Sequence, residues 1–193
     1  MEINIGGLQK FSLSDYPNKI AAIVFLRGCN FRCSYCHNVD LWDTTLQSMP
    51  LETIFDFLKR RRKQLNAVVI SGGEPTIYAD LPLFLKEIKK LNYDIKLNTN
   101  GSYPDRLDML IQKKLLDYIA MDIKAPLEKY SAICMREIDV ETIQKSISLI
   151  TKSDIPHEFR TTDDLKHLSK EDLQQIKKFL IPRNSQYYIN HAR

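Results

Sequence analysis

Short apolar segments alternate with amphipathic helical segments along this chain, and this alternation restricts its fold more than any other feature. The apolar segments are rich in β-branched residues and have the length of buried strands. Six strands are predicted, at residues 20–26, 67–70, 94–99, 118–123, 157–161 and 186–190. Helices are predicted between them, at 51–65, after Asp80, after Pro104, at 141–151 and after Ser169. Strands that alternate with helices are typical of a parallel sheet with right-handed crossovers.

The number of repeats predicts a barrel that does not close. Six strand–helix repeats can be counted, and the last lacks its helix. A complete eight-fold barrel usually needs about 250 residues, whereas this chain has 193. We therefore expect an α/β fold, an incomplete (β/α)6 TIM-like barrel, formed as one domain by residues 1–193.

Three of the four cysteines form a tight cluster directly after the first predicted strand. Cys29, Cys33 and Cys36 have the spacing C-x3-C-x2-C, and in a parallel barrel this position belongs to the face that carries active sites. A tight cluster in a reducing cytosol more often indicates metal than disulfides. Iron–sulfur clusters are usually held by four thiolates, so three would leave one iron open to a substrate or cofactor.

Two other interpretations of the cysteine cluster remain open at this point. The three thiols could hold zinc together with His37 or a distant residue, although zinc sites usually contain two C-x2-C pairs and no second pair is present. A purely structural role is the other alternative. The fourth cysteine, Cys134, has no neighbouring cysteine in the sequence, and we expect a small buried side chain.

Motifs along nearly the whole chain carry a resemblance to a known family. They include residues 7–13, 15–17, 28–33, 35–38, 71–75, 98–101, 121–124 and 159–162. With these segments the sequence resembles the radical S-adenosylmethionine (SAM) superfamily, and within it the glycyl-radical-enzyme activases. It is most similar to the short activating proteins of anaerobic ribonucleoside-triphosphate reductase. The fold implied is the radical SAM type of incomplete barrel.

The resemblance implies a [4Fe–4S] cluster and SAM as cofactors, bound around residues 28–38. Cys29, Cys33 and Cys36 would each ligate one iron, and the amino and carboxylate groups of SAM would bind the fourth. The residues expected to contact SAM are Tyr35, Gly72, Gly73, Glu74, Thr99, Asp122, Lys124 and Arg160. Asn98 replaces an aspartate that belongs to a monovalent-cation site in some relatives.

The implied chemistry is reductive cleavage of SAM. A flavodoxin or ferredoxin would supply one electron, and SAM would yield methionine and a radical that takes a hydrogen atom from a glycine of the partner enzyme. The protein would orient the reactants and exclude water and oxygen.

Several of these residues also have structural interpretations. Gly72 and Gly73 could simply form the turn that ends a strand. Asp122 and Lys124 lie two residues apart on one strand face and could be an ordinary ion pair. Arg160 could be a solvated strand end.

Composition limits the class of protein further. Hydrophobic residues make up 44% of the chain, charged residues 27%, and the net charge is +4, all ordinary for a globular protein. No apolar run is long enough for a membrane span, and no secretory signal is visible, so we expect a cytoplasmic protein.

The basic run at 59–63 falls near the end of a predicted helix, where cations complement the helix dipole. Docking of an acidic electron donor is its alternative role. No aromatic residues are interleaved with the run, which argues against nucleic acid. The closing residues His191 and Arg193 match no motif.

Three functions compete on the sequence alone. The first is the reductase activase, with the activase of another glycyl radical enzyme, such as pyruvate formate-lyase, as its variant. The second is a radical SAM enzyme with a small-molecule substrate, of the 7-carboxy-7-deazaguanine synthase type. The third is a zinc-stabilised binding module without catalysis.

Overall fold

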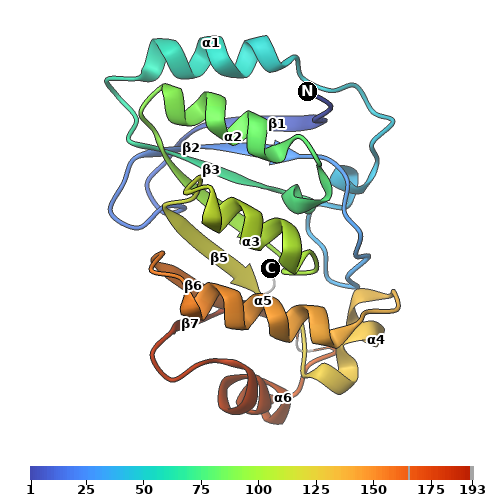
Figure 1. Cartoon of the computed structure of the whole chain (residues 1–193). Coiled ribbons are helices and arrows are strands. Elements are labelled where there is room, and N and C mark those ends of the chain that lie inside the picture. Colours follow the sequence, from blue (N-terminus) through green and yellow to red (C-terminus); the bar gives the residue numbers. More distant parts are fainter. Residues whose placement is uncertain (165, 192–193) are drawn as a thin grey trace.

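The chain folds around one seven-stranded sheet that curves into an incomplete barrel (Figure 1). The computed structural model describes residues 1–164 and 166–191. In spatial and chain order the strands are β1 (Ile5–Ser12), β2 (Ala21–Leu26), β3 (Ala67–Gly72), β4 (Asp94–Thr99), β5 (Tyr118–Asp122), β6 (His157–Asp163) and β7 (Gln186–His191). Strands β2 to β7 are parallel, and β1 pairs with β2 in the antiparallel sense. The six parallel strands are those predicted from the sequence.

Helices cover the outer face of the sheet, and in Figure 1 α2, α3 and α5 lie in front of it and α1 lies above it. The α-helices are α1 (Leu51–Arg61), α2 (Leu81–Lys90), α3 (Pro104–Gln112), α4 (Tyr130–Cys134), α5 (Val140–Lys152) and α6 (Lys170–Gln175), which continues into the π-helical turn η4 (Ile176–Leu180). The 3₁₀ turns are η1 (Val39–Trp42), η2 (Pro75–Ile77) and η3 (Leu127–Lys129). Within the described residues no helix is long and apolar enough to cross a bilayer.

The core has two parts because side chains alternate across a strand. Outward-facing strand residues such as Val68 and Leu97 pack against apolar helix residues such as Phe84, all of them fully buried. A smaller apolar cluster fills the inside of the barrel at the end where the parallel strands begin. It consists of Tyr16, Ala21, Ile23, Ala67, Val69 and Tyr118. The inner face of the sheet is therefore apolar near the starts of β2 and β3, whereas Lys96 of β4 and Glu158 of β6 place an ion pair beside Tyr118.

The structure corrects the sequence predictions in three places. Strand β1 was not predicted, because its residues are mostly exposed or half-buried and lack an apolar run. The predicted helix 51–65 ends at Arg61 instead, although Leu65 is still buried. Asp80 does precede α2, but its carboxylate makes no cap bond and accepts the backbone N–H of Glu2 at 2.7 Å.

Candidate functional site

A pocket opens where the parallel strands end, and loops from five strands form its wall. It is lined by Cys29, Phe31, Cys33, Tyr35, Cys36, His37, Asn38, Trp42, Ser71, Gly72, Gly73, Asn98, Thr99, Asn100, Asp122, Lys124, Arg160 and Thr162. All three clustered cysteines are among them, together with six of the seven residues of the later strands and loops that were expected to contact SAM, namely Gly72, Gly73, Thr99, Asp122, Lys124 and Arg160. Tyr35 lines the pocket as well, whereas Glu74 does not.

The cysteine loop follows β2 and is fastened to the C-terminal end of α4. The backbone N–H of Arg32 donates to the carbonyl of Cys134 at 2.9 Å, and that of Ser34 donates to Ile133 at 3.2 Å. Phe31 is buried beneath the loop and packs edge-on against Tyr130, with ring centroids 6.4 Å apart. The short helix α4 is thus the support on which the three thiols are presented to the pocket.

The clustered thiols differ in their environment. Burial raises the pKa of the Cys29 thiol to about 11. A hydrogen bond with the thiol of Cys134, helped by the charge of Lys124, lowers the pKa of Cys33 to about 7. Cys134 itself is fully buried, as predicted, and does not line the pocket. All four cysteines are free thiols.

The donor set fits an iron–sulfur cluster with one iron left open. Three thiols line one pocket, and thiolate is the ligand of such clusters. Within residues 1–164 and 166–191 no three His, Cys, Asp or Glu side chains converge on a point that would hold a single ion. A four-iron cluster does not require this convergence, because each thiolate binds a different iron.

The loop after β3 approaches the cysteine loop so closely that side chains are excluded. A Cβ placed on Gly73 would lie 2.0 Å from the carbonyl oxygen of Gly28, and one on Gly72 would lie 2.2 Å from that of Leu26. Gly72 also has a φ of +116°, which residues with a Cβ rarely adopt. Glycine is therefore required at both positions to bring this loop to the pocket wall.

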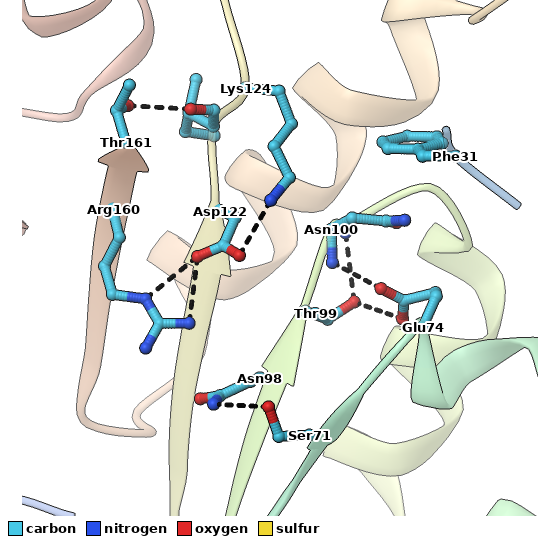
Figure 2. A network of polar contacts seen from close by, with 12 residues as sticks. Phe31, Ser71, Glu74, Asn98, Thr99, Asn100, Asp122, Lys124, Arg160 and Thr161 are labelled. Carbon is cyan, nitrogen blue, oxygen red and sulfur yellow. Dashed lines mark hydrogen bonds and ion pairs between the residues drawn. The ribbon is translucent and has the colours of Figure 1, made fainter. Parts of the chain in front are cut away.

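Glu74 does not line the pocket, and its carboxylate points toward Thr99 and Asn100 of the next loop (Figure 2). Its carboxylate is fully buried and accepts four hydrogen bonds, from the N–H and hydroxyl of Thr76, the hydroxyl of Thr99 and the N–H of Asn100. Burial raises the pKa of Glu74, and the hydrogen bonds partly oppose this. The Glu74 side chain therefore affects the pocket indirectly, by holding Thr99 and Asn100, which line it.

Asparagine side chains connect the cysteine loop to the loop after β4. The amide of Asn30 donates to the hydroxyl of Ser102 at 2.9 Å and accepts from the amide of Asn100 at 3.0 Å. Asn98 donates to the hydroxyl of Ser71 at 3.1 Å, but its Oδ1 is buried without a partner among the described residues. This orphaned acceptor lies on the pocket wall, and the ammonium or hydroxyl groups of SAM are donors of the kind it lacks.

A three-residue ion network forms the opposite wall. Asp122 accepts from Arg160 Nε at 3.0 Å and from Lys124 Nζ at 3.0 Å, as Figure 2 shows. Burial acts to raise the pKa of Asp122, but the two cations outweigh it and lower the pKa to about 2. Burial acts to lower the pKa of Lys124, but Asp122 raises it well above its ordinary value. All three groups are therefore ionised, and the network carries one net positive charge that suits a carboxylate ligand.

The remaining candidates from the sequence lie elsewhere. Residues 59–63 are exposed at the end of α1, where the parallel strands begin. A six-residue strand separates this end from the pocket by roughly 20 Å, so the basic run is not part of the site. His191 is exposed and pairs with Asp163 at 2.6 Å. Arg193 lies outside the described residues.

Sequence reasoning missed Ser71, Asn100 and Thr162, which also line the pocket. Ser71 and Asn100 fall within the matched motifs, but their side-chain partners depend on which loops meet in space. The position of Thr162 in the pocket could have been predicted from strand alternation, since it lies two residues after Arg160 on β6 and so faces the same side.

Comparison with known proteins gives a family for this arrangement. The sequence profile of the radical SAM superfamily matches residues 23–180. Over 186 residues the chain is 37% identical to a protein of Methanocaldococcus jannaschii named "Putative glycyl-radical enzyme activating enzyme", covering 92% of this chain and 75% of that protein. It is also 34% identical over 113 residues to the pyruvate formate-lyase 1-activating enzyme of Escherichia coli K12, covering 54% of this chain and 46% of that enzyme.

Solved structures share the fold at low sequence identity. The structure of anSMEcpe with bound AdoMet, which is SAM, superposes with a TM-score of 0.63 at 17% identity, covering 86% of this chain and 49% of that chain. Streptococcus suis SuiB superposes with a TM-score of 0.67 at 15% identity, covering 86% of this chain and 38% of that chain. The chain thus spans half or less of the length of these two structures, and the likeness concerns the incomplete barrel.

Proposed function

Because the chain belongs to the radical SAM superfamily, and within it to the glycyl-radical-enzyme activating enzymes, we propose that it installs the glycyl radical of an anaerobic ribonucleoside-triphosphate reductase. Enzymes of this superfamily use a [4Fe–4S] cluster and SAM. Because this family consists of enzymes, it excludes the interpretation as a zinc-stabilised binding module, which the cysteines alone had left open. The choice of the reductase as the partner enzyme is based on the resemblance of the sequence motifs described above.

The observation that carries the proposal is the meeting of three thiols and a ligand-binding wall in one pocket. Cys29, Cys33 and Cys36 line the pocket together with the Asp122 network. Loaded with both cofactors, the pocket would cleave SAM with one electron from the cluster and generate the radical that abstracts a hydrogen atom from the partner's glycine. The three cysteines would hold three irons and leave the fourth for the amino and carboxylate groups of SAM.

The other pocket residues would bind and orient SAM. Lys124 and Arg160 supply the positive charge that attracts its carboxylate. The loop of Gly72 and Gly73 brings backbone polar groups to its amino group, because no Cβ stands between them. Tyr35 and Thr99 complete the surroundings of the adenine and ribose. Each of these roles is transferred from the family motif to a residue that lines the pocket here, except that Glu74 acts by holding Thr99 and Asn100.

Pyruvate formate-lyase is the second candidate partner. The specific observation in its favour is the similarity to pyruvate formate-lyase activating enzymes, although the chain covers 46% of the length of the Escherichia coli enzyme. A small-molecule substrate, as in an enzyme of the 7-carboxy-7-deazaguanine synthase type, has no such support among the relatives named above. The electron donor in either case would be a flavodoxin or ferredoxin, which must dock near the pocket and not at residues 59–63.

The test is radical transfer to a defined partner. The anaerobically reconstituted protein is mixed with SAM, a reductant and either the reductase or pyruvate formate-lyase, and the glycyl radical is measured by EPR. We expect a doublet on the reductase that is absent with the Cys33→Ala variant and with a reductase whose radical glycine is replaced by alanine. A radical on pyruvate formate-lyase alone would transfer the proposal to that partner. No radical on either partner, with SAM cleavage intact, would overturn the activase proposal.

A further inference from the structure

Two opposite charges are buried inside the barrel, below the pocket and outside its wall. Lys96 on β4 and Glu158 on β6 are 62 residues apart in sequence, yet Lys96 Nζ lies 3.0 Å from Glu158 Oε1. The side chains are 4% and 9% exposed. The hydroxyl of Tyr118 donates to the other carboxylate oxygen at 2.9 Å. A buried ion pair often fails to stabilise a protein more than apolar packing would, so this pair invites a functional explanation.

The pair continues upward into the pocket as a line of alternating charges. Arg160 Nη1 lies 3.7 Å from Glu158 Oε1, on the side of the carboxylate that Lys96 also approaches. The same guanidinium holds Asp122, with Nε and Nη2 each 3.0 Å from Oδ1. Asp122 in turn holds Lys124. The order is therefore Lys96, Glu158, Arg160, Asp122 and Lys124, and the last three line the pocket.

Arg160 stands between two carboxylates that compete for it. Its contact with Glu158 is long, whereas its contacts with Asp122 are hydrogen bonds. Glu158 already has Lys96 and Tyr118 as partners at 3.0 and 2.9 Å. Without Lys96, Arg160 would be the one cation left beside Glu158 among these five groups. The guanidinium would then be drawn down into the barrel and away from Asp122.

We propose that Lys96 is a positioning residue for the SAM site: by neutralising Glu158 it leaves Arg160 free to hold Asp122 at the pocket wall. The line of five groups contains three cations and two anions. Loss of Lys96 removes the single positive charge in excess, and with it part of the attraction for the carboxylate of SAM. This inference rests on the proposed function in one respect, namely that SAM is the ligand of the pocket.

Asp15 is a further acidic group near this line. Its charge acts on both Lys96 and Arg160. Its carboxylate accepts hydrogen bonds from the hydroxyls of Ser12 and Ser14, which hold it in the loop after β1. It adds negative charge near Glu158 and so strengthens the need for Lys96.

The test compares three variants after anaerobic reconstitution of the cluster. Lys96→Met removes the cation, Lys96→Met with Glu158→Gln removes both charges, and Lys89→Met is the control because it breaks the ion pair with Asp117 away from the pocket. The dissociation constant of SAM is measured by calorimetry, and folding is followed by thermal unfolding. We expect Lys96→Met to weaken SAM binding about tenfold, or ~1.4 kcal/mol. The double variant and the control should both bind within about threefold of wild type, which is ~0.65 kcal/mol.

The outcomes separate this inference from the proposed function. A wild-type protein that holds the cluster but binds no SAM would overturn the function of the pocket itself. Wild-type binding that is unchanged in Lys96→Met, or equally weak in the single and double variants, would overturn the positioning role of Lys96. If Lys96→Met does not fold, Lys96→Gln keeps a hydrogen-bond donor for Glu158 without the charge. The proposal then requires weaker SAM binding by Lys96→Gln, and binding equal to wild type would overturn it.

Discussion

The carboxylate of Glu74 accepts the backbone N–H of Asn100 at 2.6 Å, across 26 residues of sequence. This bond joins the loop after β3 to the loop after β4. The side chain of Asn100 in turn donates a hydrogen bond to Asn30 of the cysteine loop. Three loops that carry the pocket wall are therefore held to one another by their own side chains. Glu74 is the centre of this arrangement, since it satisfies four donors at once.

Replacement of Glu74 should therefore destabilise the protein. Glu74→Ala leaves buried donors of Thr76, Thr99 and Asn100 without an acceptor, and we expect a loss of at least ~2 kcal/mol in the free energy of unfolding. Urea denaturation measures this loss. The control is Glu87→Ala, because Glu87 is a partly exposed residue of α2 that pairs with Lys90 at 2.6 Å, and its loss should stay within about 0.5 kcal/mol. Equal effects of the two substitutions would contradict the role given to Glu74.

A methyl group at Gly73 should be far more damaging than one at Gly7. The Cβ of Gly73→Ala would meet the backbone oxygen of Gly28 at 2.0 Å, whereas that of Gly7→Ala would meet its nearest side-chain atom, on Phe25, at 3.9 Å. We expect Gly73→Ala to lower the melting temperature and weaken SAM binding, because the two loops must separate. Gly7→Ala should change neither by a measurable amount. Wild-type behaviour of Gly73→Ala would show that the loops are not held as closely as described.

Asp122 should make the stability of the apo-protein depend on pH in the acid range. Its pKa is about 2 in the folded protein and about 3.9 in an unfolded chain. A lowered folded pKa stabilises the folded state above about pH 4, and this contribution is lost as the pH falls toward 2. Wild type should therefore exceed Asp122→Asn by about 1–2 kcal/mol at pH 5 and above. Denaturation curves at several pH values should show this difference shrinking below about pH 4; a difference that stays constant down to pH 2.5 would contradict the ion network.

The metal content should depend on three of the four cysteines. Single alanine substitutions of Cys29, Cys33 and Cys36 should abolish most of the iron and sulfide, because each thiolate would hold a different iron of the cluster. Cys134→Ala should retain nearly wild-type iron, since Cys134 does not line the pocket. Iron and zinc are measured after anaerobic purification. One zinc per wild-type chain, or a loss of iron in Cys134→Ala equal to that in Cys33→Ala, would be inconsistent with this assignment.

The fold followed from the sequence where side-chain pattern alone decides the structure. The parallel strands β2 to β6 are long enough and buried enough to be recognised, and β7 was predicted although most of its residues are exposed. The Ser169 cap of α6 was correctly placed, with Asp172 completing a capping box. Strand β1 was not predicted, because its sequence contains Gly6 and Gly7 followed by exposed residues and so lacks a strong apolar pattern. Its place at the sheet edge depends on pairing with β2.

The cysteine triplet and the residues at the strand ends could be placed at one pocket because parallel strands end on the same side. Two features could not be predicted. The orientation of the Glu74 carboxylate depends on donors from the next loop, and the Lys96–Glu158 pair depends on how β4, β5 and β6 are aligned across the barrel. In both cases the partners lie far apart in sequence, so no local pattern connects them.

Cleavage of SAM by the protein alone tests the central claim most directly, because it needs the three thiolates and the pocket but no partner. The reconstituted protein is incubated anaerobically with SAM and dithionite, and 5′-deoxyadenosine and methionine are quantified by chromatography. The account predicts equal amounts of the two products from wild type and none from Cys33→Ala. Iron-loaded wild-type protein that leaves SAM intact under reducing conditions would contradict it.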